Sequence, residues 1–167
     1  QVISMAFLTS DDAPIIWRGP MLHGALQQFF REVRWTQLAY LISDMPPGTG
    51  DVAMGLARML PRAELIVVTT PATGAQKVAT RAVTMARKSH IRVAGVIENM
   101  SAFTADDGTE YALFGRGGGE RLATEAGVPL IGSIPLEPEV SNGGDEGRPV
   151  ALGEGRAATA FRSIAER

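Results

Sequence analysis

Cysteine is absent from this sequence of 167 residues. The chain therefore forms no disulfide bond and supplies no thiolate to a zinc ion or an iron–sulfur cluster. It also lacks any apolar run approaching the roughly 18 residues that a membrane-spanning helix requires. The formal net charge of −2 gives no electrostatic basis for binding nucleic acid or an anionic membrane. No basic region precedes the apolar segment 2–8, so we expect a cytoplasmic protein by default.

Lysine is also rare, and it occurs only at positions 77 and 88. Neither lysine lies in a G-x-x-x-x-G-K-[ST] loop, and no lysine follows the glycine-rich stretch 115–119. We interpret that stretch as a flexible connector, with Arg116 as an alternative anion ligand. The loop that cradles nucleotide phosphates is therefore missing, and we expect no tight ATP binding by this chain alone.

Apolar segments alternate with segments of helical periodicity along the whole chain. The predicted strands are residues 2–8, 39–43, 65–69, 93–97 and 129–133, and the predicted helices are residues 20–33, 52–60, 75–88, 120–126 and 157–166. The segments 101–114 and 142–144 are predicted to be loops. This alternation is typical of an α/β fold, with a parallel sheet, right-handed crossovers and helices on both faces.

The segment 44–51 carries the main chemical signal, and it reads D-M-P-P-G-T-G-D. Asp44 follows a predicted buried strand, and ligands bind at the carboxyl ends of strands in open α/β sheets. The two prolines end the strand, and the glycines permit a tight turn close to a ligand. A carboxylate that holds a metal-bound water, next to a loop that senses a terminal phosphate, indicates a magnesium–nucleotide site. The alternative is a strand-to-helix turn with an incidental acid.

Two further strand ends carry polar or turn-forming residues, namely Glu98 with Asn99 and Ile134 with Pro135. An asparagine amide both donates and accepts hydrogen bonds, so it can read the edge of a purine base, and a proline-bearing loop can cover the ring. Asn99 by itself is more typical of a turn or a helix cap. The ordered combination of Asp44, Asn99 and Pro135 predicts a purine-nucleotide site at one edge of the sheet.

Several motifs together resemble the Mrp/ApbC family of P-loop ATPases, which are relatives of MinD. The segment 44–51 is similar to the switch II sequence of that family. The family's W-R-G-P, E-N-M-S, F-G-x-G-G and I-P-L motifs resemble residues 17–20, 98–101, 114–118 and 134–136. The motifs occur in the family's order and cover nearly the whole chain, so together they are highly specific.

The resemblance implies a deviant-Walker nucleotide fold, a homodimer, and ATP hydrolysis in an iron–sulfur cluster carrier or scaffold that serves apo client proteins. It implies ATP and Mg²⁺ as cofactors. By resemblance, Asp44 is the catalytic switch II acid, and it binds magnesium through a water molecule. Pro47 and Gly48 belong to the loop that senses the γ-phosphate. Asn99 contacts adenine, and Pro135 lines the base pocket.

The sequence departs from the family in two respects. The Walker A half is absent, so we expect residues 1–167 to be the carboxyl-terminal part of one nucleotide-binding domain in a longer polypeptide. The family places C-x-x-C after E-N-M-S, whereas residues 102–109 here read A-F-T-A-D-D-G-T. Carboxylates are poor ligands for clusters held by thiolates, and this loop argues against an iron–sulfur cluster bound by the chain.

Two other hypotheses remain open at this stage. In one, the chain is a non-catalytic module that has lost nucleotide and cluster chemistry and contributes a dimer surface. In the other, it is a positioning ATPase like MinD or ParA, although residues 157–167 are too short and too mixed in charge to favour a membrane helix. Titration with Mg-ATP distinguishes an ATPase from the non-catalytic module.

Overall fold

The computed structural model describes residues 1–4, 7, 19–45 and 51–167. The chain divides into two compact units, Gln1–Pro61 and Arg62–Arg167. Two of the predicted site residues, Pro47 and Gly48, lie outside the described residues.

The first unit contains two helices that contact each other, α1 (Gly19–Arg31) and α2 (Asp51–Met59). Both helices were predicted from the spacing of their apolar residues. Each helix buries an apolar side chain, Ala25 from α1 and Leu56 from α2. After α1 the chain is held by the indole of Trp35, whose Nε1 donates a hydrogen bond of 2.9 Å to the carbonyl oxygen of Phe29.

The strands predicted at residues 2–8 and 39–43 are wrong wherever the structure describes these segments. Residues 1–4 and 39–45 form neither helix nor strand. Most of their apolar side chains are exposed, with 86% of Tyr40 and 92% of Ile42 accessible to solvent. An apolar segment becomes a strand only where a neighbouring strand accepts its backbone hydrogen bonds. The described residues of the first unit include no such neighbour.

The second unit contains a parallel sheet of three strands in the order β1-β2-β5. These strands are β1 (Glu64–Thr69), β2 (Arg92–Asn99) and β5 (Leu130–Ile134), and all were predicted from short apolar runs. β2 is central and pairs with β1 on one side and β5 on the other. At the amino-terminal ends of β1 and β2, Arg92 forms a salt bridge with Glu64, its partner in the strand register.

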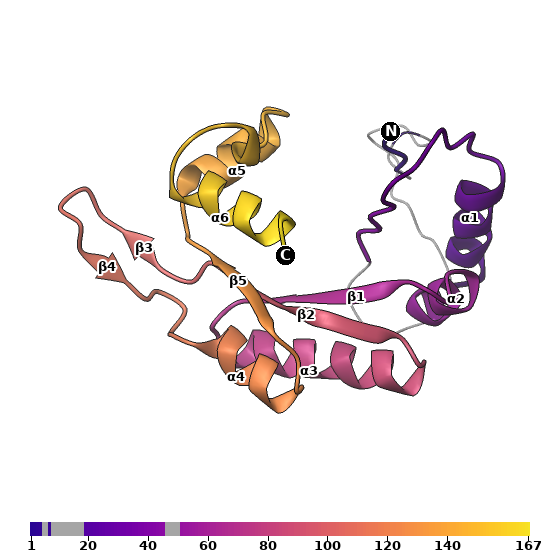
Figure 1. Ribbon diagram of the computed structural model, residues 1–167, viewed down its shortest axis with the longest axis horizontal. Helices are drawn as coiled ribbons and strands as arrows, with labels where there is room; N and C mark the ends of the chain where they lie inside the picture. Colours follow the sequence, from indigo (N-terminus) through magenta and orange to yellow (C-terminus); the bar gives the residue numbers. More distant parts are fainter. Residues whose placement is uncertain (5–6, 8–18, 46–50) are drawn as a thin grey trace. The chain divides into compact units, whose positions relative to one another are not determined.

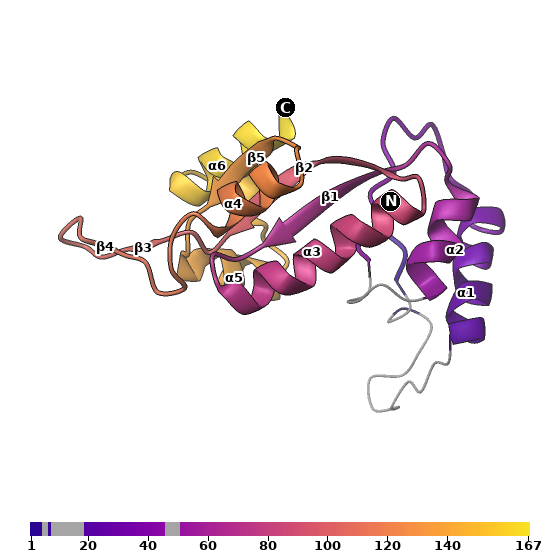
Figure 2. The same ribbon diagram turned by 90° about the horizontal axis from the view of Figure 1, so that it is seen from below.

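Helices cover both faces of this sheet (Figure 1). α3 (Thr73–Lys88) and α4 (Gly118–Glu125) pack on one face, and α6 (Arg156–Ala165) packs against β5 on the other. Figure 2 shows α3 running along the sheet beside β1. The predicted α/β architecture is therefore confirmed. The buried core between the sheet, α3 and α4 consists of Val67, Ala79, Val83, Val96, Leu122, Ala123 and Ala126.

The structure corrects two predicted loops of the second unit. Segment 101–114 contains an antiparallel hairpin of β3 (Phe103–Thr104) and β4 (Glu110–Tyr111), which projects from the sheet in both views (Figures 1 and 2). Segment 142–144 lies inside α5 (Pro138–Asp145). The glycine at position 143 serves close packing, because a Cβ there would lie 2.5 Å from the carbonyl oxygen of Arg148. A short 3-10 turn, Val150–Leu152, then leads to α6.

The open edge of β1 supports a prediction about self-association. Among the described strands β1 pairs only with β2, and its side chains of Ile66 and Val68 are 49% and 58% exposed. An unpaired apolar edge is a template for pairing with another chain. We expect the isolated 167-residue chain to associate, and Val68→Lys to reduce the association, in light scattering over a concentration series.

The matched control for this experiment is Val78→Lys on α3, where the valine is 55% exposed but lies on a helix. This variant is expected to associate as the unmodified chain does. A monodisperse monomer at every concentration would contradict the prediction.

Candidate functional site at the carboxyl ends of the strands

The parallel strands of the second unit end at a common edge. Thr69 at the end of β1 is paired in register with Glu98, and Asn99 at the end of β2 is paired with Ile134 at the end of β5. Neighbouring strands lie about 4.8 Å apart. The structure therefore places the two predicted base-binding residues, Asn99 and Pro135, at adjacent strand ends.

The side chain of Asn99 has a defined orientation. Its Oδ1 accepts a hydrogen bond of 2.9 Å from the backbone N–H of Met100. Met100 has a φ of 57°, in the left-handed region that a non-glycine residue seldom adopts, so the chain turns sharply at the end of β2. The amide nitrogen of Asn99 makes no hydrogen bond with any described residue, and it is available as a donor to a ligand.

Backbone hydrogen bonds hold Pro135 beside the segment that leaves β2. The N–H of Ser101 donates to the carbonyl oxygen of Ile134 at 3.0 Å, and the N–H of Leu136 donates to that of Ala102 at 2.8 Å. Pro135 lies between these two bonds and has no N–H to satisfy. Its half-buried ring is thus held at the same edge as Asn99.

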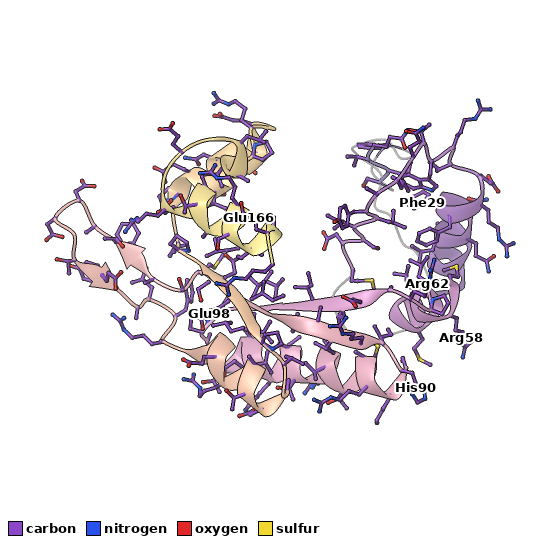
Figure 3. The ribbon with its side chains drawn as sticks, viewed as in Figure 1. Phe29, Arg58, Arg62, His90, Glu98 and Glu166 are labelled. Atoms are coloured by element: carbon purple, nitrogen blue, oxygen red, sulfur yellow. The ribbon has the colours of Figure 1, made fainter. Side chains whose placement is uncertain are left out.

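A buried carboxylate adjoins this edge on the side of α4. Glu98, which is labelled in Figure 3, is only 6% exposed. Its Oε2 accepts a hydrogen bond of 2.6 Å from the N–H of Gly119. Gly119 lies in the first turn of α4, where backbone N–H groups have no partner within the helix and attract negative charge. A Cβ at Gly119 would lie 2.6 Å from the Cβ of Glu98, so the close approach requires glycine.

The preceding glycine makes an equally close contact with the end of β1. A Cβ at Gly118 would lie 2.7 Å from the carbonyl oxygen of Pro71 and 2.5 Å from Nε2 of Gln76. That Nε2 donates a hydrogen bond of 2.6 Å to the same carbonyl oxygen. The stretch 115–119, interpreted from the sequence as a flexible connector, therefore ends in two glycines that are packed tightly against the strand ends.

The third predicted site residue, Asp44, belongs to the first unit. Its side chain is exposed and forms no ion pair with a described residue. Mg²⁺ typically keeps several waters and binds to proteins through one or two carboxylates together with substrate phosphates. The chemistry of Asp44 therefore fits a magnesium ligand that acts through water.

The hairpin loop follows residues 98–101, the position after which the resemblance implies a C-x-x-C motif. Its turn is closed by the N–H of Ala105, which donates to the carbonyl oxygen of Thr109 at 2.9 Å. The N–H of Thr109 donates to the carboxylate of Asp107, and this hydrogen bond lowers the pKa of Asp107 below its ordinary value. The described residues include no group of three or more histidine, aspartate or glutamate side chains that could hold a metal ion. Because the sequence has no cysteine, the hairpin loop offers no thiolate to an iron–sulfur cluster.

A surface depression elsewhere in the second unit does not coincide with this edge. It has a volume of about 410 Å³ and is lined by Gly117, Glu120, Arg121, Thr124 and Glu125. None of the predicted site residues lines it. Because its lining comes from α4 and the residue before it, we assign it no part in the candidate site.

The hydrogen bond between Glu98 and Gly119 was missed by sequence reasoning. Glu98 was recognised as a polar strand end, and residues 115–119 as glycine-rich, but nothing in the sequence joined them. Two features of the sequence could have indicated this contact. A charged residue that closes an apolar strand needs a buried partner, and consecutive glycines often mark a close approach between backbones.

The parallel sheet with helices on both faces is an α/β fold, and solved structures of MinD-like P-loop NTPases share it. MinD from Aquifex aeolicus has this fold, with a TM-score of 0.61, 19% identity, and coverage of 92% of this chain and 61% of that one. A family model described as "ParA: NUBPL iron-transfer P-loop NTPase" matches residues 1–167. The chain belongs to this family.

Relatives and solved structures agree with this assignment. An iron–sulfur cluster carrier protein of Mycobacterium tuberculosis is 51% identical over 158 residues, which are 91% of this chain and 42% of the relative. One from Synechocystis is 44% identical over 162 residues, covering 96% of this chain and 46% of the relative. A nucleotide-binding protein from Archaeoglobus fulgidus, solved with ADP and cobalt, has a TM-score of 0.67 and 32% identity, and the match covers 77% of this chain and 53% of that one.

The chain thus spans less than half the length of these curated relatives. Within the part of the chain that the structure describes, no helix is long and apolar enough to cross a membrane.

Proposed function

We propose that this chain supplies the switch II and adenine-binding half of an ATP-hydrolysing iron–sulfur cluster carrier. Family membership over residues 1–167 supports this proposal, as do relatives of about 50% identity that bear the carrier name. The observation that carries it is the placement of Asn99 and Pro135 at the ends of two paired strands, with the amide nitrogen of Asn99 unpaired among the described residues.

Each residue has a distinct role in the proposal. Asn99 reads the adenine edge, because its amide can donate to one position of the base and accept from another. Pro135 covers the base and keeps water from it. Asp44 holds a water bound to magnesium, and the loop that includes Pro47 and Gly48 follows the γ-phosphate. Mg-ATP, when bound, supplies the phosphoryl group that is transferred to water.

We propose hydrolysis, dimer formation and client binding for the protein expressed from the complete reading frame. Hydrolysis also requires a phosphate-binding loop, and residues 1–167 contain no sequence of that kind. We propose that this protein is a homodimer and serves apo iron–sulfur clients. Because the chain has no cysteine, thiolates that hold the transported cluster must come from a partner or from residues outside this sequence.

Calorimetric titration with Mg-ATP tests the proposal when it is run on two samples, the 167-residue chain and the product of the complete reading frame. Binding by the complete product, with weak or no binding by the chain alone, is the expected result. Failure of the complete product to bind would refute the proposal.

Asn99→Ala is expected to reduce the preference for ATP over GTP. Adenine presents a donor beside an acceptor, which matches an asparagine amide, whereas guanine presents two acceptors on the same edge. Loss of the amide should lower the ratio of the ATP and GTP binding constants by about tenfold. The measurement is competition between the two nucleotides on the complete product. Asn142→Ala, which removes an exposed amide from α5, should leave the ratio unchanged.

A second candidate function is a dimerising module without nucleotide or cluster chemistry. The hairpin that replaces C-x-x-C favours it, because this hairpin offers backbone hydrogen bonds and carboxylates but no thiolate. This module would dimerise with the same affinity in the presence and absence of Mg-ATP. Sedimentation analysis of the complete product with and without nucleotide separates the two candidates.

A further inference from the structure

Glu98 occupies a chemically unusual position for a carboxylate. It is 6% exposed, and the residues before it in β2, Val96 and Ile97, are 0% and 9% exposed. A carboxylate in such surroundings is costly unless hydrogen bonds compensate for the lost hydration. The bond from the N–H of Gly119 supplies this compensation and adds the favourable field of a helix N-terminus.

This bond caps α4 from a distant part of the chain. The residue that precedes the helix is Gly117, which has no side chain and makes no capping hydrogen bond. The oxygen that accepts from the first turn of α4 comes instead from the end of β2. The position of α4 and the end of β2 are therefore linked directly.

The same bond joins the two ends of the segment that contains the hairpin. The chain leaves the sheet at Met100 and returns at Gly117, and both residues have left-handed backbone conformations, with φ of 57° and 66°. Glu98 lies two residues before the first of these turns, and Gly119 lies two residues after the second. Figure 3 shows Glu98 at the end of the sheet from which the hairpin departs, on the side of α4.

Asn99 is the next residue along β2, and successive side chains of a strand point to opposite faces of the sheet. A carboxylate held against α4 on one face fixes the backbone at the end of β2, from which the amide of Asn99 projects to the other face. We propose that Glu98 is a positioning residue that holds Asn99 in the orientation required to read the purine base. This inference rests on the proposed function, and Glu98 itself touches neither nucleotide nor metal in it.

Two substitutions test the proposal on the product of the complete reading frame. Glu98→Ala removes the acceptor and should lower the ratio of ATP to GTP binding constants by about tenfold, because an unpaired buried N–H destabilises the local arrangement. Glu98→Gln retains an acceptor oxygen and should keep the ratio within about threefold of the unmodified protein. A partly unfolded variant binds less of both nucleotides, but its ratio does not change.

A second readout needs no nucleotide. Hydrogen exchange at the amide of Gly119 should accelerate by about tenfold or more in Glu98→Ala and remain slow in Glu98→Gln. The matched control is Glu120→Ala, which removes an exposed carboxylate from the same turn of α4. This carboxylate forms no hydrogen bond with a described residue. It should change neither the nucleotide ratio nor the exchange rate.

The outcomes separate this inference from the proposed function. If the unmodified protein prefers ATP and Glu98→Ala retains that preference, Glu98 does not position Asn99, and the proposed function stands. If the unmodified protein binds neither nucleotide, both are overturned. Loss of preference in Glu98→Ala, with rescue by Glu98→Gln, supports the positioning role.

Discussion

Asp44→Ala is expected to abolish ATP hydrolysis by the product of the complete reading frame, with turnover at least about a hundredfold lower. The carboxylate of Asp44 is exposed, so it is available to hold a magnesium-bound water at the γ-phosphate. An alanine cannot fix that water, and the loss should appear in kcat. Steady-state phosphate release at saturating Mg-ATP is the measurement.

The matched control for Asp44→Ala is Asp107→Ala, which removes another exposed carboxylate, from the hairpin turn. Its turnover should equal that of the unmodified protein. Turnover by Asp44→Ala within about threefold of the unmodified protein would refute the switch II assignment, provided that thermal unfolding shows the variant to be folded.

Gly118→Ala is expected to lower the free energy of unfolding of the second unit by about 2 to 3 kcal/mol. Its Cβ would lie 2.5 Å from Nε2 of Gln76 and 2.7 Å from both Cα and the carbonyl oxygen of Pro71. Gln76 can rotate away, but the backbone at Pro71 can yield only if α4 moves from the strand ends. Urea denaturation followed by circular dichroism measures the change.

Gly74→Ala is the matched control, because it also places a methyl group in the first turn of a helix, α3, where no atom lies within 4 Å. Alanine is favoured over glycine in helices, so this variant should be unchanged or more stable by up to about 1 kcal/mol. Equal stabilities of the two variants would show that α4 is not tightly packed against Pro71, in the segment that follows β1.

The fold of the second unit was largely predictable from local patterns. β1, β2 and β5 are short apolar runs, and α3 shows an apolar face at helical spacing, so period and length were sufficient to assign them. The hairpin and α5 were not predicted. The hairpin strands are only two residues long, and the glycines of α5 were misread as a link because their packing role depends on a later segment.

The candidate site was predictable only as a set of residue types at strand ends. The order of Asp44, Asn99 and Pro135 along the chain is a property of the sequence, and the strand register then places the latter two at adjacent strand ends. The strand expected before Asp44 did not form, because pairing depends on a neighbour and the local apolar pattern does not supply one. Asp44 therefore remains a prediction from its motif.

By itself, the sequence determined the α/β character of this protein, its family and the lack of thiolate ligands, since all three depend on residue identity and local periodicity. Tertiary structure alone decided that Glu98 caps α4, that Gly118 and Gly119 wedge this helix against the strand ends, and that the segment before Asp44 stays exposed. The physical reason is that these features depend on contacts between residues far apart in the chain. Local propensity carries no information about such contacts.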